Sequence, residues 1–192
     1  MIVGATTLIV VNTLIFGFVT WLPTFFVQEG RSIASSLGYS LIISLGAPLG
    51  TALGALTADS WGRKPTIIGA SLLTIAIGSV YPFVNNPAEL LMVGFLLMIP
   101  IYVLVGVLFA IYIPELFPTE VRMRASGICN TFGRGATILT PFIVVALFRS
   151  YEVRGVLGFL IGLLIAQILV VLKFGVEPKK RRLEEIDNAV MS

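Results

Sequence analysis

Several residue types on which catalytic and metal sites depend are scarce or missing from this sequence. Histidine is absent, cysteine occurs once, at Cys129, and charged residues make up 12% of the 192 residues. A single cysteine can form neither a disulfide within the chain nor a cysteine-rich metal site, and the lack of histidine removes the commonest general base and metal ligand. We therefore expect no cofactor, no metal site and no enzymatic activity. Soluble domains carry roughly 25% charged residues, so the low charge also excludes an ordinary water-soluble surface.

Long apolar stretches take the place of the missing charges. Hydrophobic residues make up 57% of the chain. An α-helix needs about 20 residues to cross a hydrocarbon core about 30 Å thick, and the apolar stretches form six segments near or above this length, the fifth interrupted only by Arg134. The pattern predicts an all-α integral membrane protein, with a six-transmembrane-helix bundle over residues 1–176 and a basic tail over 177–192. The approximate spans are 4–27, 37–58, 66–84, 90–113, 126–148 and 155–174.

Lysine and arginine are distributed unequally between the two ends of the predicted helices. Nine lie in the turns after the second and fourth spans and in the tail, and three, Arg31, Arg149 and Arg154, lie at the opposite end. Short cytoplasmic loops hold an excess of basic residues, so we expect both termini in the cytoplasm. The net charge of +3 follows from this topology, and we expect a lipid bilayer, and no nucleic acid, as a partner.

Small residues recur every four positions in the second predicted span. Gly46, Gly50 and Gly54 are followed at the same interval by Ala58. Such a stripe lets the backbone of another helix approach closely. The partner could be a helix of this chain or a helix of another half or subunit, and we expect it in another half.

Two short turns at the predicted cytoplasmic end carry opposite charges at helix ends. The first is Asp59-Ser60-Trp61-Gly62-Arg63-Lys64, in which glycine is free to take positive φ, and the second is Pro114-Glu115-Leu116-Phe117-Pro118-Thr119-Glu120-Val121-Arg122. Charges that pair across the bundle could hold its cytoplasmic mouth closed in one state and release it in another. The turns therefore predict a cytoplasmic gate formed by Asp59, Gly62, Arg63, Lys64, Glu115 and Arg122.

These turns resemble motifs of the major facilitator superfamily. Asp59 to Lys64 is similar to its D-R-x-G-R-[RK] loop, and Pro114 to Arg122 is similar to the P-E-x-x-P-T-x-x-R motif of the sugar-porter and metabolite-symporter branches. The tail, with Glu177-Pro178 and Leu183 to Ile186, resembles the ending of those families. The resemblance implies helices 7 to 12 of a twelve-helix fold. It thus implies one half of a secondary transporter of a bacterial inner membrane, whose N-terminal six-helix half is missing.

The sequence also departs from the sugar-porter pattern. Ser60 replaces the usual basic residue, Ala55 stands where the leading glycine is expected, and the Q-Q-x-S-G-x-N stretch of sugar-porter helix 7 is absent. Val19 to Thr24 resembles bacterial metabolite:proton symporters and aromatic-acid transporters instead. The resemblance therefore implies transport of a small polar metabolite, with an organic anion as one candidate. It also implies symport, although all ten acids of this chain lie at helix ends, in loops or in the tail.

One charged residue, Arg134, lies within a predicted span, about 15 Å along the helix from Arg124. An arginine at the bilayer centre costs about 2.5 to 3.5 kcal/mol, so its side chain should find a polar environment. Asn130 and Thr137 share its helix face, and Thr131 adds to the polar patch. The guanidinium could bind the carboxylate of a substrate. It could equally pair with an acid of another chain or with backbone carbonyls, or extend to the cytoplasmic surface.

Two further polar residues lie at a depth where polarity is costly. Asn12 in the first span and Tyr102 in the fourth could line a central cavity or hydrogen-bond between helices. The candidate substrate-binding residues are Asn12, Tyr102, Asn130, Thr131 and Arg134.

A different class of function competes with transport. Met1 lies at the edge of the first span, which suggests a fragment, a disrupted reading frame or an internal start. The alternative function is that of a truncated or non-transporting membrane remnant or scaffold that needs a second six-helix half. A dimer of six-helix units is a third hypothesis. Six further spans encoded upstream, with another D-x-x-G-R-[RK] turn, would support the first.

Overall fold

The structure, a computed structural model, describes residues 1–28, 30–84 and 86–175. These residues form helices and turns, and no strand occurs among them. The first segment consists of α1 (Ile2–Leu14), the π-helical η1 (Ile15–Val19) and α2 (Leu22–Gln28). The second segment consists of α3 (Ile33–Ser44) and α4 (Gly46–Ser60). They are followed by α5 (Arg63–Val80) with the 3-10 turn η2 (Tyr81–Phe83), then α6 (Pro87–Val105), the π-helical η3 (Gly106–Tyr112) and α7 (Ile113–Glu115), and finally α8 (Arg122–Phe174).

Five helical segments of the described chain are long and apolar enough to cross a membrane. They are Ile2–Gln28, Ile33–Ser60, Arg63–Phe83, Pro87–Glu115 and Arg122–Phe174. The prediction of an all-helical membrane protein is thus confirmed, whereas six separate spans were expected. The difference lies in α8, which contains both of the last two predicted spans.

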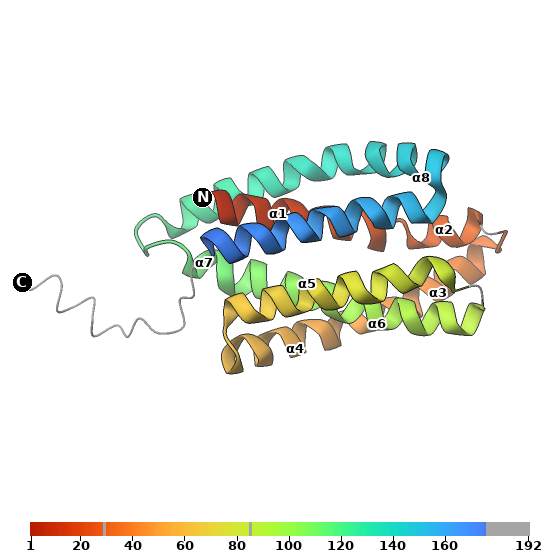
Figure 1. Cartoon of the computed structure of the whole chain (residues 1–192), viewed down its shortest axis with the longest axis horizontal. Helices are drawn as coiled ribbons and strands as arrows, with labels where there is room; N and C mark the ends of the chain where they lie inside the picture. Colours follow the sequence, from red (N-terminus) through yellow and green to blue (C-terminus); the bar gives the residue numbers. More distant parts are fainter. Residues whose placement is uncertain (29, 85, 176–192) are drawn as a thin grey trace, which may run out of the picture.

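The length of α8 exceeds what a single crossing needs. A straight helix of its 53 residues would extend about 80 Å. Its backbone leaves helical geometry at Glu152, where φ is 55° and ψ is −151°, a conformation that is strained for a residue with a side chain. Figure 1 shows the chain reversing its direction in this part of α8. We call the residues before Glu152 the first arm of α8 and those after it the second arm.

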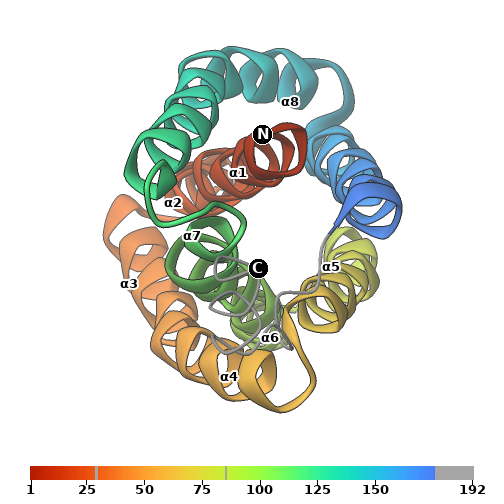
Figure 2. The ribbon, with the colours of Figure 1, turned by 90° about the vertical axis from the view of Figure 1, so that its left-hand side faces the viewer.

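The helices enclose an apolar core. Figure 2 shows α1 between the two arms of α8, with α6 next to α3, α4 and α5. Leu14, Phe18, Leu97, Ile101 and Leu160 are almost completely buried. On the outside, by contrast, side chains such as Leu56, Phe132 and Phe142 are well exposed. An apolar exterior of this extent suits contact with lipid.

The stripe of small residues on α4 packs against α6 of this chain. Its members, Gly46, Gly50, Gly54 and Ala58, are all buried. A Cβ on Gly46 would lie 2.8 Å from the carbonyl oxygen of Phe95, and a Cβ on Gly54 would lie 3.0 Å from that of Val103. Only residues without larger side chains permit this approach of two backbones. The expectation that a helix of another half covers the stripe is therefore wrong, because α6 occupies it.

The turn between α4 and α5 needs glycine. Gly62 has φ 109° and ψ 165°, a region that residues with a Cβ rarely adopt. The turn lies at the same end of the bundle as α7 and the end of α8. The predicted tail over 177–192, including its motif residues, lies outside the described residues.

Candidate functional site

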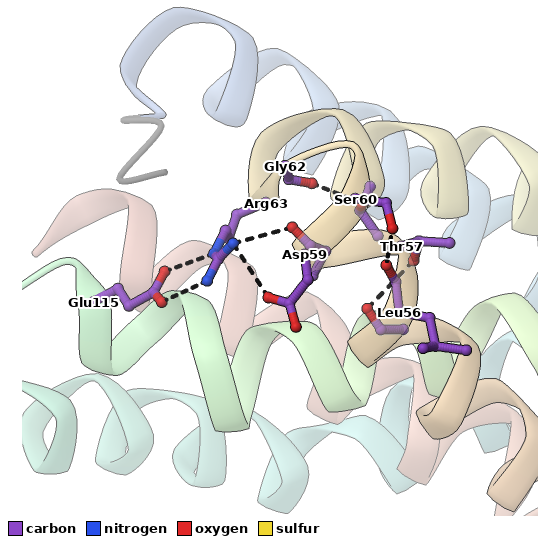
Figure 3. Close-up of polar contacts among 10 residues, drawn as sticks. Leu56, Thr57, Asp59, Ser60, Gly62, Arg63 and Glu115 are labelled. Atoms are coloured by element: carbon purple, nitrogen blue, oxygen red, sulfur yellow. Dashed lines mark hydrogen bonds and ion pairs between the residues drawn. The ribbon is translucent and has the colours of Figure 1, made fainter. Parts of the chain in front are cut away.

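The strongest polar interaction in the described chain joins the start of α5 to α7. Arg63 donates from Nε to Glu115 Oε2 and from Nη2 to Glu115 Oε1, both at 2.9 Å. Figure 3 shows this bidentate pair together with Asp59. An arginine and a carboxylate in this geometry form charge-assisted hydrogen bonds that also fix the relative orientation of the two groups. The pair therefore holds two segments that are 52 positions apart in the chain.

Asp59 completes a three-residue charge cluster. Its Oδ1 lies 3.4 Å from Arg63 Nη1, which also donates to the carbonyl of Ala58 at 3.1 Å. The side chain of Arg63 is 15% exposed, that of Glu115 is 35% exposed and that of Asp59 is 74% exposed. Because Arg63 opens α5, where the helix dipole disfavours a cation, two carboxylates offset its charge. The more buried carboxylate, Glu115, contributes the better geometry.

Lys64 joins the same turn to another helix end. Its Nζ donates to the carbonyl of Leu172 at 2.9 Å and to that of Gly175 at 3.4 Å. The last carbonyls of a helix have no partner within the helix, and a cation near them is favourable. Arg63 and Lys64 together therefore connect the α4–α5 turn to α7 and to the C-terminal end of α8.

The sixth residue predicted for the gate lies elsewhere. Arg122 donates from Nε to the carbonyl of Phe117 at 3.4 Å and from Nη2 to Thr119 Oγ1 at 3.5 Å. The ion pairs found among the described residues join Arg63 to Asp59 and to Glu115. The structure thus brings Asp59, Gly62, Arg63 and Glu115 together, with Lys64 adjacent. It places Arg122 at the start of α8, where its side chain bonds to the preceding loop.

The patch predicted around Arg134 lies on the first arm of α8. Arg134 and Thr131 are exposed and Asn130 is half-buried. The hydroxyls of Thr131 and Thr137 donate within the helix, to the carbonyls of Gly127 at 3.0 Å and of Arg134 at 2.7 Å. In the part of the chain that the structure describes, the guanidinium of Arg134 has no hydrogen bond or ion pair. Its side chain is therefore exposed and available to a partner outside these residues.

The two other candidates lie at helix interfaces. Asn12 is 2% exposed and donates to the carbonyl of Leu8 at 2.8 Å, and a Cβ on Gly133 would lie 2.8 Å from its Nδ2. Asn12 therefore fills the contact between α1 and α8. Tyr102 is half-buried, and its Cβ would lie 2.8 Å from a Cβ on Gly50. In this structure Tyr102 packs at the α4–α6 contact.

An internal cavity of the bundle does not suit a polar metabolite. It lies among α1, η1, α5, α6 and the second arm of α8. Its lining residues are almost all apolar: Leu14, Phe18, Thr74, Gly78, Leu97, Ile101, Leu157, Leu160, Ile161 and Leu164. A polar substrate needs hydrogen-bonding groups at its binding site. The exposed patch around Arg134 is therefore the better candidate.

The sequence analysis did not single out one buried polar contact. Gln167 and Ser71 are both 0% exposed, and Gln167 Nε2 donates to Ser71 Oγ at 3.1 Å. This bond joins the second arm of α8 to α5. A signal was present, since Gln167 is the one strongly polar residue between Gly155 and Leu172.

The sequence matches known membrane proteins along its length. Residues 1–190 match the profile of a family described as "Sugar (and other) transporter". The chain is 35% identical over 187 residues to the inner membrane metabolite transport protein YdjE of Escherichia coli (strain K12), covering 96% of this chain and 41% of the relative. It is 31% identical over 186 residues to YdjK of the same organism, covering 97% and 40%.

A third relative carries a substrate in its name. The niacin transporter NiaP of Acinetobacter baylyi is 29% identical over 181 residues, covering 89% of this chain and 39% of the relative. The chain spans about two fifths of the length of these three relatives.

Proposed function

The chain belongs to the sugar (and other) transporter family of the major facilitator superfamily, and on this premise we propose that it forms one half of a secondary transporter for a small organic anion. The family and the named relatives carry out membrane transport, and neither indicates an enzyme. The chain, which spans 41% of YdjE, would need a second half to move a solute. Symport, with the coupling group in that half, is part of the proposal.

The proposal gives α8 two membrane crossings. The reversal at Glu152 divides its 53 residues into two arms, each of which matches a predicted span. With the four preceding segments, the chain then supplies six of twelve helices, both termini lying in the cytoplasm of a bacterial inner membrane. Transporters of this kind work by rocking one half against the other around a site between the halves.

The charged end is proposed as part of the cytoplasmic gate. The pair of Arg63 with Glu115 and the bond from Lys64 to the end of α8 would keep α5, α7 and α8 in one arrangement. Loosening of this cluster would let the helix ends separate during the cycle.

Arg134 carries the proposal of an anionic substrate. Its guanidinium lies about 15 Å along the helix from Arg124 and has no partner among the described residues, so an anion at the site between the halves would neutralise it. A guanidinium binds a carboxylate through two parallel hydrogen bonds. The relative from Acinetobacter is named for niacin, which is a pyridine carboxylic acid, and this name supports the same substrate class.

Uptake of small organic anions by the complete transporter in proteoliposomes tests the proposal. Arg134→Ala is expected to lose nearly all specific uptake, and Arg134→Lys is expected to lose most of its affinity, because an ammonium lacks the planar fork of the guanidinium. Arg149→Ala, which removes an exposed arginine of the same helix, serves as the control and should transport normally. Parental uptake by Arg134→Ala, at equal abundance in the membrane, would contradict the proposal.

A further inference from the structure

A groove runs along the outer side of α5. It is lined by Lys64, Pro65, Ile68, Gly69 and Leu72 and has a volume of about 570 Å³. Pro65, Gly69 and Leu72 are exposed, so the groove is open along its length. Figure 2 shows α1 and the second arm of α8 between α5 and the first arm of α8, against which the proposed function places the second half. In the transporter the groove therefore opens toward lipid, because α5 belongs to a segment that is apolar enough to cross a membrane.

The hollow of the groove lies at Gly69. A Cβ built on Gly69 meets nothing within 4 Å, so no side chain of the described residues fills the space above it. The glycines of α4 differ, because the backbone of α6 takes the place of their missing side chains. A Cβ on Gly54, for example, would lie 3.0 Å from the carbonyl oxygen of Val103. An empty space forfeits dispersion contacts, so we expect an apolar chain from outside the protein over Gly69.

The length of the groove matches one leaflet of a bilayer. From Lys64 to Leu72 the helix advances about 12 Å, and half of a hydrocarbon core about 30 Å thick is about 15 Å. Lys64 follows the first residue of α5, at the end where the membrane segment begins. The other lining residues are apolar. The groove thus has a cation at the membrane surface and an apolar path into the leaflet.

The surface end of the groove is positively charged. The ammonium of Lys64 bonds to two carbonyls at the end of α8, and these neutral acceptors leave its charge in place. Lys173, which is exposed, lies in the last turn of α8 beside these carbonyls. The positive end of the α5 dipole has the same sign, and Gly62 provides no side-chain cap for it. Arg63, by contrast, is offset by its two carboxylates. This end therefore favours an anionic headgroup.

From this shape and charge we propose that the groove binds an anionic phospholipid. The phosphate lies at Lys64, and one acyl chain lies along Gly69 and Leu72. The inference rests on the proposed function only for the position of the second half, and the substrate does not enter it. The tail over 177–192 is a poor occupant, because half of its residues are charged and charge is costly in the hydrocarbon region.

Photocrosslinking of lipid probes to the complete transporter tests the proposal. The transporter is reconstituted in phosphatidylcholine vesicles that contain a trace of one of two probes. Both probes carry the same diazirine-bearing acyl chain, and the headgroup is either phosphatidylglycerol or phosphatidylcholine. Mass spectrometry of the peptides gives the crosslinking yield on α5 and on the second arm of α8. Because one lysine near the membrane surface contributes about fivefold to the binding of anionic lipid, the phosphatidylglycerol probe should label α5 about fivefold more than the other probe. Around Gly162 the two probes should label equally.

Two variants test the two ends of the lipid. Lys64→Met keeps an apolar stem and removes the charge, so the ratio of the two yields on α5 should fall to within about twofold of one. Gly69→Phe fills the hollow and should lower both yields on α5 by at least about threefold. This second variant keeps the test valid should Lys64→Met loosen the end of α8.

Gly162→Phe and Arg124→Gln are the controls. A Cβ at Gly162 likewise meets nothing within 4 Å, and this glycine lies in the second arm of α8, far from the groove in sequence. Arg124 is an exposed cation at the start of α8, at the same end of the bundle as Lys64. Neither variant should change the yields on α5.

Several results would overturn the proposal. Equal labelling of α5 by the two probes in the parent, or a parental ratio in Lys64→Met, would show that no anionic headgroup is selected. Parental yields in Gly69→Phe would show that no acyl chain lies in the groove. If a chain that ends at Gly175 is labelled more strongly on α5 by both probes equally, the tail is the occupant. Absence of both probes from α5 would assign the groove to the second half. None of these results involves uptake, so the proposal can fail while the transport of an organic anion stands.

Discussion

The charged end of the bundle and the polar patch on the first arm of α8 differ in how their polar groups are satisfied. At the charged end, Arg63 has carboxylates and a carbonyl as partners, and Lys64 has two carbonyls. In the patch, Arg134 has no partner among the described residues, and Asn130 Oδ1 is buried without one. The polar groups of the first region are therefore satisfied within the described residues. Those of the second region are not, and we propose that a group from outside the chain completes it.

Close packing of α4 on α6 is what brings the charged end together. Asp59 lies near the end of α4, and Arg63 begins α5. Glu115 ends α7, which follows α6 through η3. The glycines that allow the two backbones to approach also place the turn beside α7. The comparison can thus be tested at the glycines, at the ion pair and at the helix end.

The largest loss of stability is expected from substitution of Gly50. A Cβ there would overlap the carbonyl oxygen of Ile99, so Gly50→Leu should push α4 away from α6 and cost about 3 kcal/mol or more. The yield of folded, monodisperse complete transporter and its thermal midpoint measure the loss. Gly158→Leu is the control, because a Cβ at Gly158 meets nothing within 4 Å. Equal losses in both variants would mean that the α4–α6 contact has no special role.

A smaller effect is expected from the ion pair. In a double-mutant cycle of Arg63→Gln and Glu115→Gln, the coupling energy should be about 1 kcal/mol, because Glu115 is partly exposed and the geometry is two-pronged. The cycle of Arg122→Gln with Glu115→Gln should be additive within about 0.5 kcal/mol, since Arg122, at the start of α8, bonds to the loop that precedes it. The free energy of unfolding in detergent micelles provides both values. Coupling at Arg122 equal to that at Arg63 would show that the gate is arranged differently.

The smallest loss of stability is expected from substitution of Lys64. Lys64→Met removes a cation from the end of α8 and should cost about 0.5 to 1 kcal/mol, which speeds amide hydrogen exchange near Leu172 by about two- to fivefold. Exchange in α3 is the internal control and should not change. If exchange near Leu172 stays at the parental rate, the two carbonyl bonds do not hold the helix end.

Much of the architecture could be predicted from the sequence because its causes are local. Long charge-free stretches require helices in a membrane, and Gly62 marks a turn wherever the helices pack. The prediction of the family, with a transporter rather than an enzyme, is confirmed as well by the family match and the relatives. The partners of the helices could not be predicted, since they depend on contacts between distant segments. The stripe on α4 faces α6, Arg122 bonds to the loop before α8, and Gln167 reaches Ser71 on α5.

For the site, counting residues was enough to place Arg134 within a helix, as the structure has it in α8, and its depth in the membrane stays a prediction. The lack of a partner for Arg134 and the burial of Asn130 Oδ1 depend on how the first arm of α8 packs, and periodicity alone does not contain that information. Asn12 shows the same limit, because its polarity allowed either a cavity or a hydrogen bond between helices, and its packing places it against Gly133.

The central claim is that the polar patch on α8 is completed by a ligand, whereas the charged end is complete without one. Thermal unfolding of the complete transporter with and without an organic anion such as benzoate tests it most directly. The parent and Arg63→Gln should both be stabilised by the ligand, by about 2.7 kcal/mol at a concentration 100 times the dissociation constant, and Arg134→Ala should show no stabilisation at the same concentration. Equal stabilisation of Arg134→Ala and the parent would contradict the account.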